Sequence, residues 1–442
     1  MPAEVAATLA SALAAAPAGP LCAGYSGGLD STVLLHALAA LPAARARGLR
    51  ALHVDHGLHA DSAEWASHCR ATCAALDVPL EVMRVTVDVA RGRGLEAAAR
   101  DARRAAFAAS LAPGELLALA HHRDDQAETV LLKLLRGAGP EGLGGMRVLR
   151  EFGNGHLFRP LLELPREALQ DYAETHGLRH VEDPSNADAR HARNFLRQAV
   201  LPLLRERWPQ VDAALGHSAR WLAQAAGHLD NAARAELARL RGLDPATLDW
   251  RGWLALPDAL RAGVLRAWLR ELDLSTPETL HIAQLEQQLA QAQADRMPCI
   301  AWAGAEIRRY REWIHALAPQ PDPPDGWRLE GWDGTAIQLP AGCGRIALAG
   351  VDDDGAPPPG IVLTLAFRRG GERLRLAGTR HTKQLRDLWQ EAGIPPWRRG
   401  RVPLVHRGDT LLAVGDYWLS EDGAAWLGGQ GLRIAWNGDA AP

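Results

Sequence analysis

The stretch Tyr25-Ser26-Gly27-Gly28-Leu29-Asp30-Ser31-Thr32 decides how the first part of this chain is read. It follows the apolar run 21–25, which predicts a buried strand, and it precedes a helical pattern that extends to Leu41. Two adjacent glycines let the backbone approach an anion closely, and the start of a helix presents free N–H groups and a partial positive charge. The stretch therefore predicts a phosphate-binding loop between a strand and a helix.

Three polar side chains refine the prediction for this loop. Ser26 and Ser31 add hydroxyl donors, whereas the lysine of a Walker A loop is missing. Asp30 would repel phosphates unless a cation lay between them, and Mg²⁺ held by Asp30 removes that conflict. A capped turn is the alternative, because Ser, Gly and Asp begin many helices. The complete string after a buried strand favours the phosphate loop.

The composition is that of an ordinary globular protein. The chain has 442 residues, of which 47% are hydrophobic and 23% are charged, and its formal net charge is −3. These values exclude the disordered, collagenous and disulfide-scaffold classes. Lys133 and Lys383 are the only lysines among the 49 basic residues, a bias typical of a GC-rich genome. A net charge near zero argues against indiscriminate coating of nucleic acids but permits a local basic patch.

The cysteine pattern and the apolar runs indicate the compartment. Five scattered cysteines contain no Cys-x-x-Cys pair, which argues against a disulfide framework or a zinc ribbon and favours a reducing cytoplasm. No stretch approaches the roughly 20 apolar residues of a membrane helix. The Ala-rich segment 1–20 has no positive start, so we expect an amphipathic first helix rather than a signal peptide.

The alternation of short apolar runs and helical stretches predicts the fold class. Short apolar runs alternate with helical stretches over the first 140 residues, as in a parallel α/β domain whose ligands collect at the carboxyl ends of the strands. Segment 160–207 is expected to be helical, with a turn at 183–186. Segment 211–317 is rich in Ala, Leu and Arg and is expected to be mostly helical, with its tryptophans in the core. The further predicted strands are Ala51–Val54, Leu80–Val85 and Leu116–Ala120.

Two breaks suggest how the chain is divided. A Pro-rich stretch spans 319–324, and an Asp- and Pro-rich stretch spans 352–359 before a β-rich end. We therefore predict a Rossmann-like parallel-sheet domain, a mainly helical domain and a small α+β domain. Their predicted bounds are 1–210, 211–318 and 325–442.

Polar residues also follow the fourth predicted strand, at His121-His122-Arg123-Asp124-Asp125. Asp125 and Glu128 share a helical face, so they could hold a substrate ammonium, coordinate Mg²⁺ or cap the helix. Asp124 is expected to be the cap. His122 is the best candidate for proton transfer, because the unperturbed pKa of histidine lies near neutrality.

The loop around Asp30 resembles the pyrophosphatase loop (PP-loop) of the N-type ATP pyrophosphatase superfamily. Taken in order, several further motifs look like the tRNA(Ile)-lysidine synthetase family. Two departures are visible, because His59 stands where the family usually has Arg and Arg104 where it usually has Tyr. The motifs that carry the resemblance are 53–58, 121–129, 135–137, 159–162, 182–186, 193–197, 367–372 and 394–398.

The resemblance implies an activity and its substrates. Members join L-lysine to C2 of the wobble cytidine in the CAU anticodon of tRNA(Ile), through an adenylated cytidine, and release AMP and pyrophosphate. ATP would be bound by Ser26, Gly27, Gly28, Leu29, Asp30, Ser31 and Asp55, and Mg²⁺ by Asp30. The catalytic residues would be Asp30, His122, Arg100 and Asp125, and lysine would be held by Asp125 and Glu128. The tRNA would be bound by Arg103, Arg193, Arg197, Arg368, Arg369 and Arg398.

Several of these roles have alternatives. Arg100 and Arg103 lie three residues apart on a predicted helix, where they could clamp the triphosphate, hold the anticodon backbone or only face solvent. Arg193 and Arg197 could form a polar face over the site or a plain helix surface. Asp55 could bind adenosine or cap a turn. Segment 361–401 has a local excess of about +7, which suits tRNA phosphates or a solvated face.

Other functions are weighed against this one. A tRNA thiolase would need reactive cysteines, and Cys69 and Cys73 read as small core residues. A small-molecule amide ligase would usually carry a glutaminase module. A non-catalytic RNA-binding module would have no use for the loop together with the His-Asp-Asp cluster. The sequence leaves open whether the protein is a monomer or a homodimer, and how tRNA(Ile) is distinguished from tRNA(Met).

Overall fold

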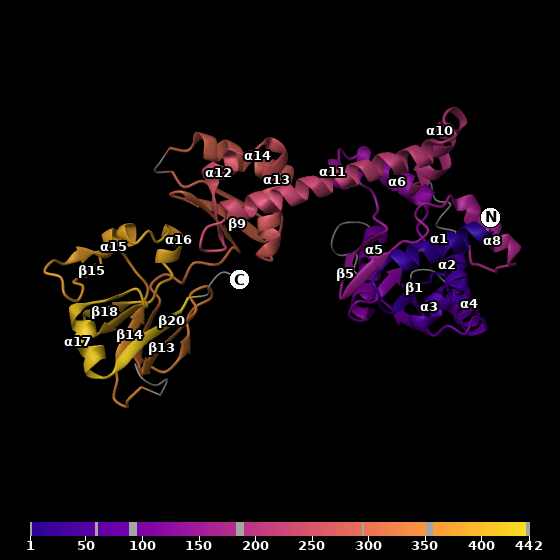
Figure 1. The fold of residues 1–442 in the computed structure, drawn as a ribbon. Helices are drawn as coiled ribbons and strands as arrows, with labels where there is room; N and C mark the ends of the chain where they lie inside the picture. Colours follow the sequence, from indigo (N-terminus) through magenta and orange to yellow (C-terminus); the bar gives the residue numbers. More distant parts are fainter. Residues whose placement is uncertain are drawn as a thin grey trace. The chain divides into compact units, whose positions relative to one another are not determined.

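The computed structural model describes residues 2–57, 61–87, 95–182, 190–293, 296–350 and 357–438. The chain forms two compact units, Met1–His228 and Leu229–Pro442, each drawn in Figure 1. The boundary between them falls inside one helix, α11 (Val211–Leu240). The predicted division into three domains stays a prediction.

The first unit is built on a 6-stranded sheet with the order β3-β2-β1-β4-β6-β5. All its pairings are parallel except that of β5 with β6. The α/β class is therefore confirmed, and β1 to β4 lie where the sequence predicts strands. The β5–β6 hairpin was not anticipated. The strands are β1 (Leu21–Gly24), β2 (Arg50–Asp55), β3 (Leu80–Arg84), β4 (Leu116–Ala118), β5 (Leu149–Phe152) and β6 (Gly155–Phe158).

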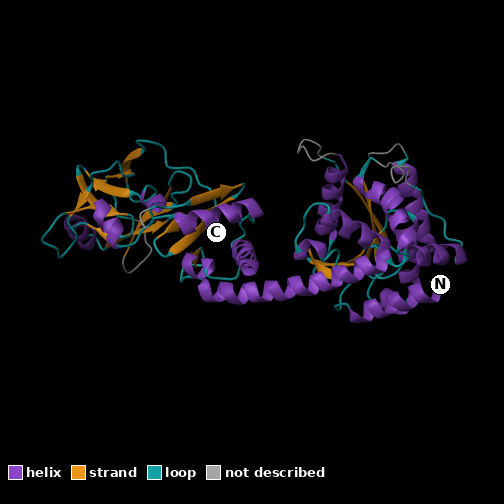
Figure 2. Cartoon of the chain, turned by 90° about the horizontal axis from the view of Figure 1, so that it is seen from above, coloured by secondary structure: helices purple, strands orange, loops and turns teal. Residues whose placement is uncertain are grey.

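Helices pack against both faces of this sheet (Figure 2). Segment 160–207 is less continuous than predicted, because it is divided into short helices; the turn predicted at 183–186 lies outside the described residues. The elements are α1 (Pro2–Ala15), α2 (Leu29–Ala40), α3 (Pro42–Ala46), α4 (Ser62–Ala75), α5 (Leu95–Ser110), α6 (Arg123–Leu134), α7 (Pro140–Leu143), α8 (Arg166–Thr175), α9 (Ala192–Phe195), a π-helical turn (Leu196–Val200) and α10 (Leu201–Arg207).

Strand β1 shows how the sheet is held in the core. Leu21 and Ala23 pack into the hydrophobic cluster that contains α1, α2 and α8, whereas Cys22 packs into a second cluster with Phe107 of α5. Successive side chains of a strand point to opposite faces, so β1 is buried on both sides. This burial fixes the position of the loop that follows β1.

The second unit begins with more β-structure than predicted. The middle segment contains helices, but its end folds into an antiparallel sheet of order β7-β10-β9-β8. The prediction that segment 211–317 is mostly helical was therefore wrong for its last part. Trp253 and Trp268 are fully buried as predicted, whereas Trp221 of α11 is exposed. The elements are β7 (Thr247–Asp249), α12 (Trp250–Leu254), α13 (Asp258–Glu271), α14 (Thr279–Gln291), β8 (Cys299–Trp302), β9 (Ala305–Tyr310) and β10 (Trp313–Leu317).

The C-terminal segment is α+β, as predicted. Its larger sheets have the orders β11-β14-β17-β18-β19 and β12-β13-β20. The elements are β11 (Arg328–Trp332), β12 (Ile337–Gln338), β13 (Arg345–Gly350), β14 (Leu363–Ala366), β15 (Arg373–Leu374), β16 (Lys383–Gln384), α15 (Leu385–Glu391), α16 (Pro396–Arg399), β17 (Leu404–Arg407), β18 (Thr410–Val414), β19 (Trp418–Leu419), α17 (Glu421–Gly429) and β20 (Leu432–Asn437).

Contacts cross the Pro-rich stretch within the second unit. The ring of Trp397 in α16 meets His315 of β10 at a centroid distance of 5.2 Å. Arg399 donates to the hydroxyl of Tyr310 over 3.2 Å. The middle and C-terminal segments are therefore packed on each other. Among the described residues, no helix combines the length and the apolar character needed to cross a membrane.

Candidate functional site

The segment between β1 and α2 folds as the predicted loop. Gly27 has a φ of +85°, and a Cβ there would lie 3.1 Å from the sulfur of Cys69, so this position requires glycine. The hydroxyl oxygens of Ser26 and Ser31 lie 3.0 Å apart, and Ser31 donates to the carbonyl of Gly28 over 3.0 Å. Leu29 begins the helix, so its free N–H groups open beside these hydroxyls.

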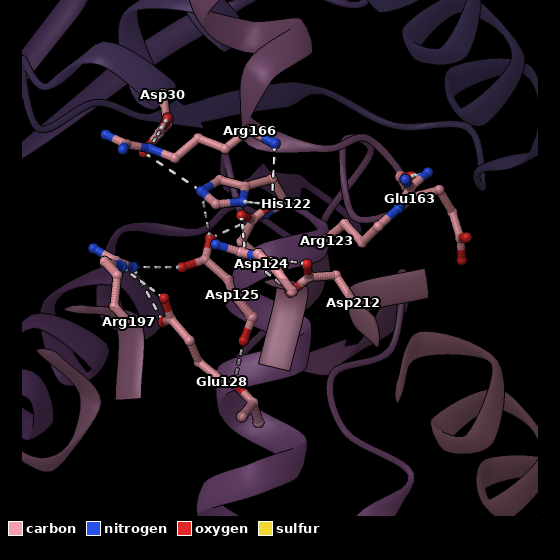
Figure 3. Close-up of polar contacts among 12 residues, drawn as sticks. Asp30, His122, Arg123, Asp124, Asp125, Glu128, Glu163, Arg166, Arg197 and Asp212 are labelled. Atoms are coloured by element: carbon pink, nitrogen blue, oxygen red, sulfur yellow. Dashed lines mark hydrogen bonds and ion pairs between the residues drawn. The ribbon is translucent and has the colours of Figure 1, made fainter. Parts of the chain in front are cut away.

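Asp30 faces His122 across the carboxyl ends of β1 and β4 (Figure 3). Its Oδ2 lies 3.8 Å from His122 Nε2, and its Oδ1 lies 3.8 Å from Arg166 Nε. Burial raises the pKa of Asp30, against the opposing charges of His122 and Arg166. Buried Oδ1 accepts no hydrogen bond from the described residues.

Asp30 fits a Mg²⁺ ion that is shared with a bound nucleotide. Mg²⁺ is usually held by one or two carboxylates together with substrate phosphates rather than by a cage of protein ligands. The described residues contain no group of three or more His, Cys, Asp or Glu suited to a metal ion. A single carboxylate, with one oxygen that accepts no hydrogen bond from the described residues, meets the lesser requirement beside a phosphate loop.

His122 is the hub of the site. It precedes α6 as the N-cap residue, and only 1% of it is exposed. Its Nε2 lies 3.3 Å from Asp125 Oδ2, and its Nδ1 lies 3.6 Å from Asp124 Oδ1. Burial alone would lower the pKa of His122, but the carboxylates of Asp124, Asp125 and Asp30 raise it above its usual value. The surrounding carboxylates therefore stabilise the protonated imidazolium.

The capping role falls on a different aspartate than predicted. Asp125, at the third position of α6, accepts the backbone N–H of His122 over 3.1 Å. Asp124 instead accepts the backbone N–H of Arg166 over 3.1 Å and pairs with Arg205 at 2.7 Å. The sequence shows that a helix begins here, but the partners of Asp124 come from distant segments.

The acidic pair Asp125 and Glu128 is neutralised by two arginines, one turn apart on α9 and the π-helical turn. Glu128 is fully buried, and its two oxygens lie 2.6 Å from Arg193 Nε and 2.6 Å from Arg197 Nε (Figure 3 labels Arg197). Asp125 Oδ1 lies 2.7 Å from Arg193 and 3.3 Å from Arg197. We call these four residues the balanced cluster.

The balanced cluster brings together residues for which the sequence predicts separate substrates. Arg193 and Arg197 were expected to contact tRNA, and Asp125 and Glu128 to contact lysine. Two cations face two anions, so a third cation needs one arginine to move. Burial would raise the pKa of Asp125, but His122 and Arg193 lower it, so the carboxylate stays charged.

Arg100 and Arg103 of α5 are both exposed but influence different groups. The charge of Arg103 helps to lower the pKa of His56, after burial, whereas Arg100 acts on Lys133, Arg150 and Arg159. The charge of Arg103 therefore acts near the end of β2, and that of Arg100 acts near β5 and α6.

Asp55, at the end of β2, occupies the turn-capping position. Its Oδ1 accepts the backbone N–H of Gly57 over 2.9 Å, and its Oδ2 lies 3.4 Å from Arg84. Only 6% of Asp55 is exposed. His59, the nearby departure from the family pattern, lies outside the described residues.

The predicted tRNA contacts of the second unit differ in their surroundings. Arg369 is exposed and Arg368 is half-buried, in the turn after β14. The guanidinium of Arg398 lies 3.3 Å from the carboxylate of Asp244, so its charge is partly neutralised within the unit.

The buried thiols argue against sulfur chemistry. Burial raises the pKa of Cys69 to about 12 and that of Cys73 to about 11. A thiol must ionise to act as a nucleophile or metal ligand. Both residues lie in the main hydrophobic cluster, as predicted for small core residues.

Sequence reasoning missed partners that reach the site from afar. Arg166 and Arg205 contact Asp30 and Asp124. Arg159 donates from Nε to Nδ1 of His121 over 3.1 Å. Of these residues, only Arg159 belongs to one of the family motifs, 159–162. A single arginine in a helical segment does not indicate which distant residue it will contact.

Comparisons with known proteins cover nearly the whole chain. Residues 1–204 match the PP-loop domain, residues 248–315 the TilS substrate binding domain and residues 363–436 the TilS substrate C-terminal domain. A tRNA(Ile)-lysidine synthase of Xanthomonas axonopodis pv. citri (strain 306) is 47% identical over 96% of this chain and 95% of its own length.

More distant relatives bear the same name. The tRNA(Ile)-lysidine synthase of Alkalilimnicola ehrlichii is 45% identical over 90% of this chain and 89% of its own length. That of Shigella flexneri is 39% identical over 93% of this chain and 95% of its own. The three matched domains follow the order of the predicted motifs.

Proposed function

The chain belongs to the tRNA(Ile)-lysidine synthase family, and from this premise we propose that it joins L-lysine to C2 of the wobble cytidine in the CAU anticodon of tRNA(Ile). ATP would activate the C2 oxygen as an adenylate with release of pyrophosphate. Attack by the lysine amine would then release AMP. The observation that carries this proposal is the meeting of a PP-loop with the Asp30–His122–Asp125 network.

We propose that ATP lies along the loop from Ser26 to Ser31, with Asp55 near its nucleoside. The hydroxyls of Ser26 and Ser31 and the N-terminus of α2 supply donors for phosphate oxygens. Mg²⁺ held by Asp30 would neutralise phosphate charge. Support comes from the glycine at φ +85° and from the Asp30 oxygen that accepts no hydrogen bond from the described residues.

We propose that His122 manages the proton of the attacking amine. Only the neutral ring can take up the proton that the amine loses, and the raised pKa makes that ring a stronger base. The three carboxylates around it favour the charged imidazolium. Arg100 would help to hold the phosphates or the RNA backbone in line.

For lysine, we propose binding at Asp125 with displacement of Arg193. Both carboxylates of the balanced cluster are already paired, so an incoming ammonium must replace a guanidinium. About 31% of the Arg193 side chain is exposed, so it has room to leave. Arg193 would then be available to tRNA phosphates, as the sequence predicts, and Arg197 would offer them only the part of its guanidinium that is exposed. Glu128 would stay buried and hold the remaining arginine.

This lysine site has a direct test. Asp125→Asn should weaken lysine use by roughly 1.5–3 kcal/mol, since a charge-assisted contact is lost. ATP-dependent adenylation of the cytidine should persist, so adenylated tRNA should accumulate. Loss of adenylation before any effect on lysine use would place the lysine pocket elsewhere.

The remaining partners follow from the same proposal. Arg103, Arg368, Arg369 and Arg398 would contribute to tRNA binding, and the protein would act in the cytoplasm. A homodimer stays a prediction, which light scattering of the purified protein would test against a monomer.

The proposed function is tested by the dependence of ATP breakdown on both substrates. Purified protein should convert ATP to AMP and pyrophosphate only with a CAU-anticodon tRNA(Ile) transcript present, and should turn over repeatedly only with lysine. Digestion of that tRNA should yield lysidine in place of one cytidine. AMP formation that needs no tRNA, or a product without lysine, would contradict the proposal.

A further inference from the structure

A second group of cations in the first unit forms no ion pair with the described residues. It comes from α5, α6, β5 and the residue that follows β6. None of its nitrogens lies within 4.0 Å of a carboxylate oxygen in the described part of the chain. We call it the cation cluster, and its members are Arg100, Arg104, Lys133, Arg150 and Arg159.

Phe152 shows that two of these cations are neighbours. The guanidinium carbon of Arg104 lies 5.6 Å from the centre of the Phe152 ring, and that of Arg150 lies 5.9 Å from it. Arg104 comes from α5 and Arg150 from β5, which lie side by side in Figure 1. An aromatic face stabilises a cation modestly, but it does not neutralise one. The Nε of Arg150 is buried and donates no hydrogen bond to the described residues.

The members repel one another. Burial, then the charges of Arg150, Arg100 and Arg104, lower the pKa of Arg159 to about 10. Burial and neighbouring arginines also lower the pKa of Lys133 and Arg150, while Glu141 acts on Lys133 in the opposite direction. Such repulsion costs folding free energy, and an anionic ligand would remove it.

The position of the cluster favours RNA over ATP. The PP-loop follows β1 and Asp55 ends β2, whereas Arg150 and Arg159 belong to the β6–β5 side of β4. Arg103 acts on His56 at the β2 side, so the exposed arginines of α5 are divided between the two sides. A chain of phosphates suits cations that are spread over a helix and a hairpin better than one triphosphate does.

The cluster also reaches the reaction site. Arg159, which is 7% exposed, donates from Nε to Nδ1 of His121 over 3.1 Å, and from NH1 to the carbonyl of Arg147 over 2.9 Å. The pKa of His121 is lowered to about 3, first by burial, so this ring is neutral and accepts at Nδ1. His121 adjoins His122 in the chain, so a phosphate held at the cluster would lie near the Asp30–His122 centre.

We propose that the cation cluster binds the phosphate backbone of the tRNA next to the reacting nucleotide, with Arg104 and Arg150, both over the Phe152 ring, as direct phosphate contacts. The inference rests on the proposed function for the identity of the RNA. It adds Arg104, Lys133, Arg150 and Arg159 to the residues for which a role is proposed.

The test measures binding without turnover. The full chain and the variants Arg104→Gln and Arg150→Gln are titrated against fluorescent tRNA(Ile) transcript over a range of KCl concentrations, with no lysine present. Arg70→Gln is the matched control, because Arg70 is exposed on α4 and forms no ion pair in the described part of the chain. ATP affinity and thermal unfolding are measured on the same proteins.

Each cluster variant should weaken tRNA binding about five- to tenfold and reduce the slope of log K against log salt by about one. ATP affinity should change less than about twofold, and Arg70→Gln should behave as the unchanged protein. Weakened ATP binding with unchanged RNA binding would assign the cluster to the nucleotide and overturn the proposal. Unchanged binding of both ligands would also overturn it. Tight RNA binding without lysidine formation would instead count against the proposed function alone.

Discussion

The balanced cluster and the cation cluster lie in the same unit, but the arginines of the first are paired with carboxylates and the cations of the second form no ion pair with the described residues. In the first, Arg193 and Arg197 meet two carboxylates at distances of 2.6 to 3.3 Å. In the second, Arg104 and Arg150 share only the ring of Phe152. Opposite charges satisfied within the protein stabilise a local structure, whereas like charges left together keep their attraction for a ligand.

This difference indicates which parts of the site are built for the fold and which for substrate. A buried carboxylate without a partner is costly, so Glu128 needs its arginines in the folded protein. Arg100 and Arg104 are exposed and can remain hydrated without a partner, so the cation cluster tolerates part of its charge until an anion arrives. Substitutions in the two clusters should therefore differ in kind as well as in size.

The largest effect is expected at Asp30, which adjoins the balanced cluster through His122. Asp30→Ala should reduce pyrophosphate release by about 100-fold or more, because the charge that offsets the phosphates through Mg²⁺ is lost. The circular dichroism spectrum and tRNA affinity should stay nearly unchanged. Asp30→Asn should be equally inactive, since an amide brings no charge; recovery of activity in that variant would argue against a metal role.

A smaller effect, on stability, separates the two clusters directly. Glu128→Gln should lower the free energy of unfolding by about 2–3 kcal/mol, because two partly buried guanidinium groups lose a shared anion. Arg150→Gln should leave it unchanged or raise it slightly, because repulsion is relieved. Urea unfolding of the variants provides the measurement.

Arg197→Gln in the Glu128→Gln background is the control for that comparison. Arg197→Gln should lower the free energy of unfolding less in this background than in the unchanged protein, since the Glu128 carboxylate is already absent. Equal losses in the two backgrounds, or a clear loss for Arg150→Gln, would remove the distinction between the clusters.

The pH dependence should follow His122. Its pKa is raised in the folded protein, so its contribution to stability is complete below the unfolded value of about 6.5 and is lost as the pH rises through the folded value. Asp124→Asn should lower the folded pKa and shift that loss to lower pH, because the anion 3.6 Å from Nδ1 is removed. NMR titration of the His122 ring measures both proteins, and an identical pKa in the two would contradict the assigned cause.

The smallest effect is expected in the second unit. Arg368→Glu or Arg369→Glu should raise the KM for tRNA a few-fold and lower the rate at saturation less, because the role proposed for these residues is in binding tRNA phosphates. The pairing of Arg398 with Asp244 makes Arg398→Glu a poorer probe, since it also removes a contact within the unit. Steady-state kinetics at two salt concentrations provide the measurement; an effect on the saturated rate alone would exclude a binding role.

The local pattern was sufficient to predict β1 to β4, α2 and α6 within a few residues. Each of these elements has a strong apolar period and a clear start or stop signal, such as the glycines before α2. The strands β5 and β6 are short and meet across a tight turn, and residues 299–317 lie next to a long helical segment. In both places the alternating strand pattern covers too few residues to predict a strand against the helical pattern of the neighbouring segments.

The sequence by itself determined the PP-loop, the strand ends that carry Asp30, Asp55 and His122, and the family. These features depend on neighbours a few residues apart, where backbone sterics and helix starts act. Only the tertiary structure decided that Arg193 and Arg197 pair with Asp125 and Glu128, and that Arg104 and Arg150 lie over one ring. Charges interact through space, and arginines on exposed helices look alike in sequence until folding sets their partners.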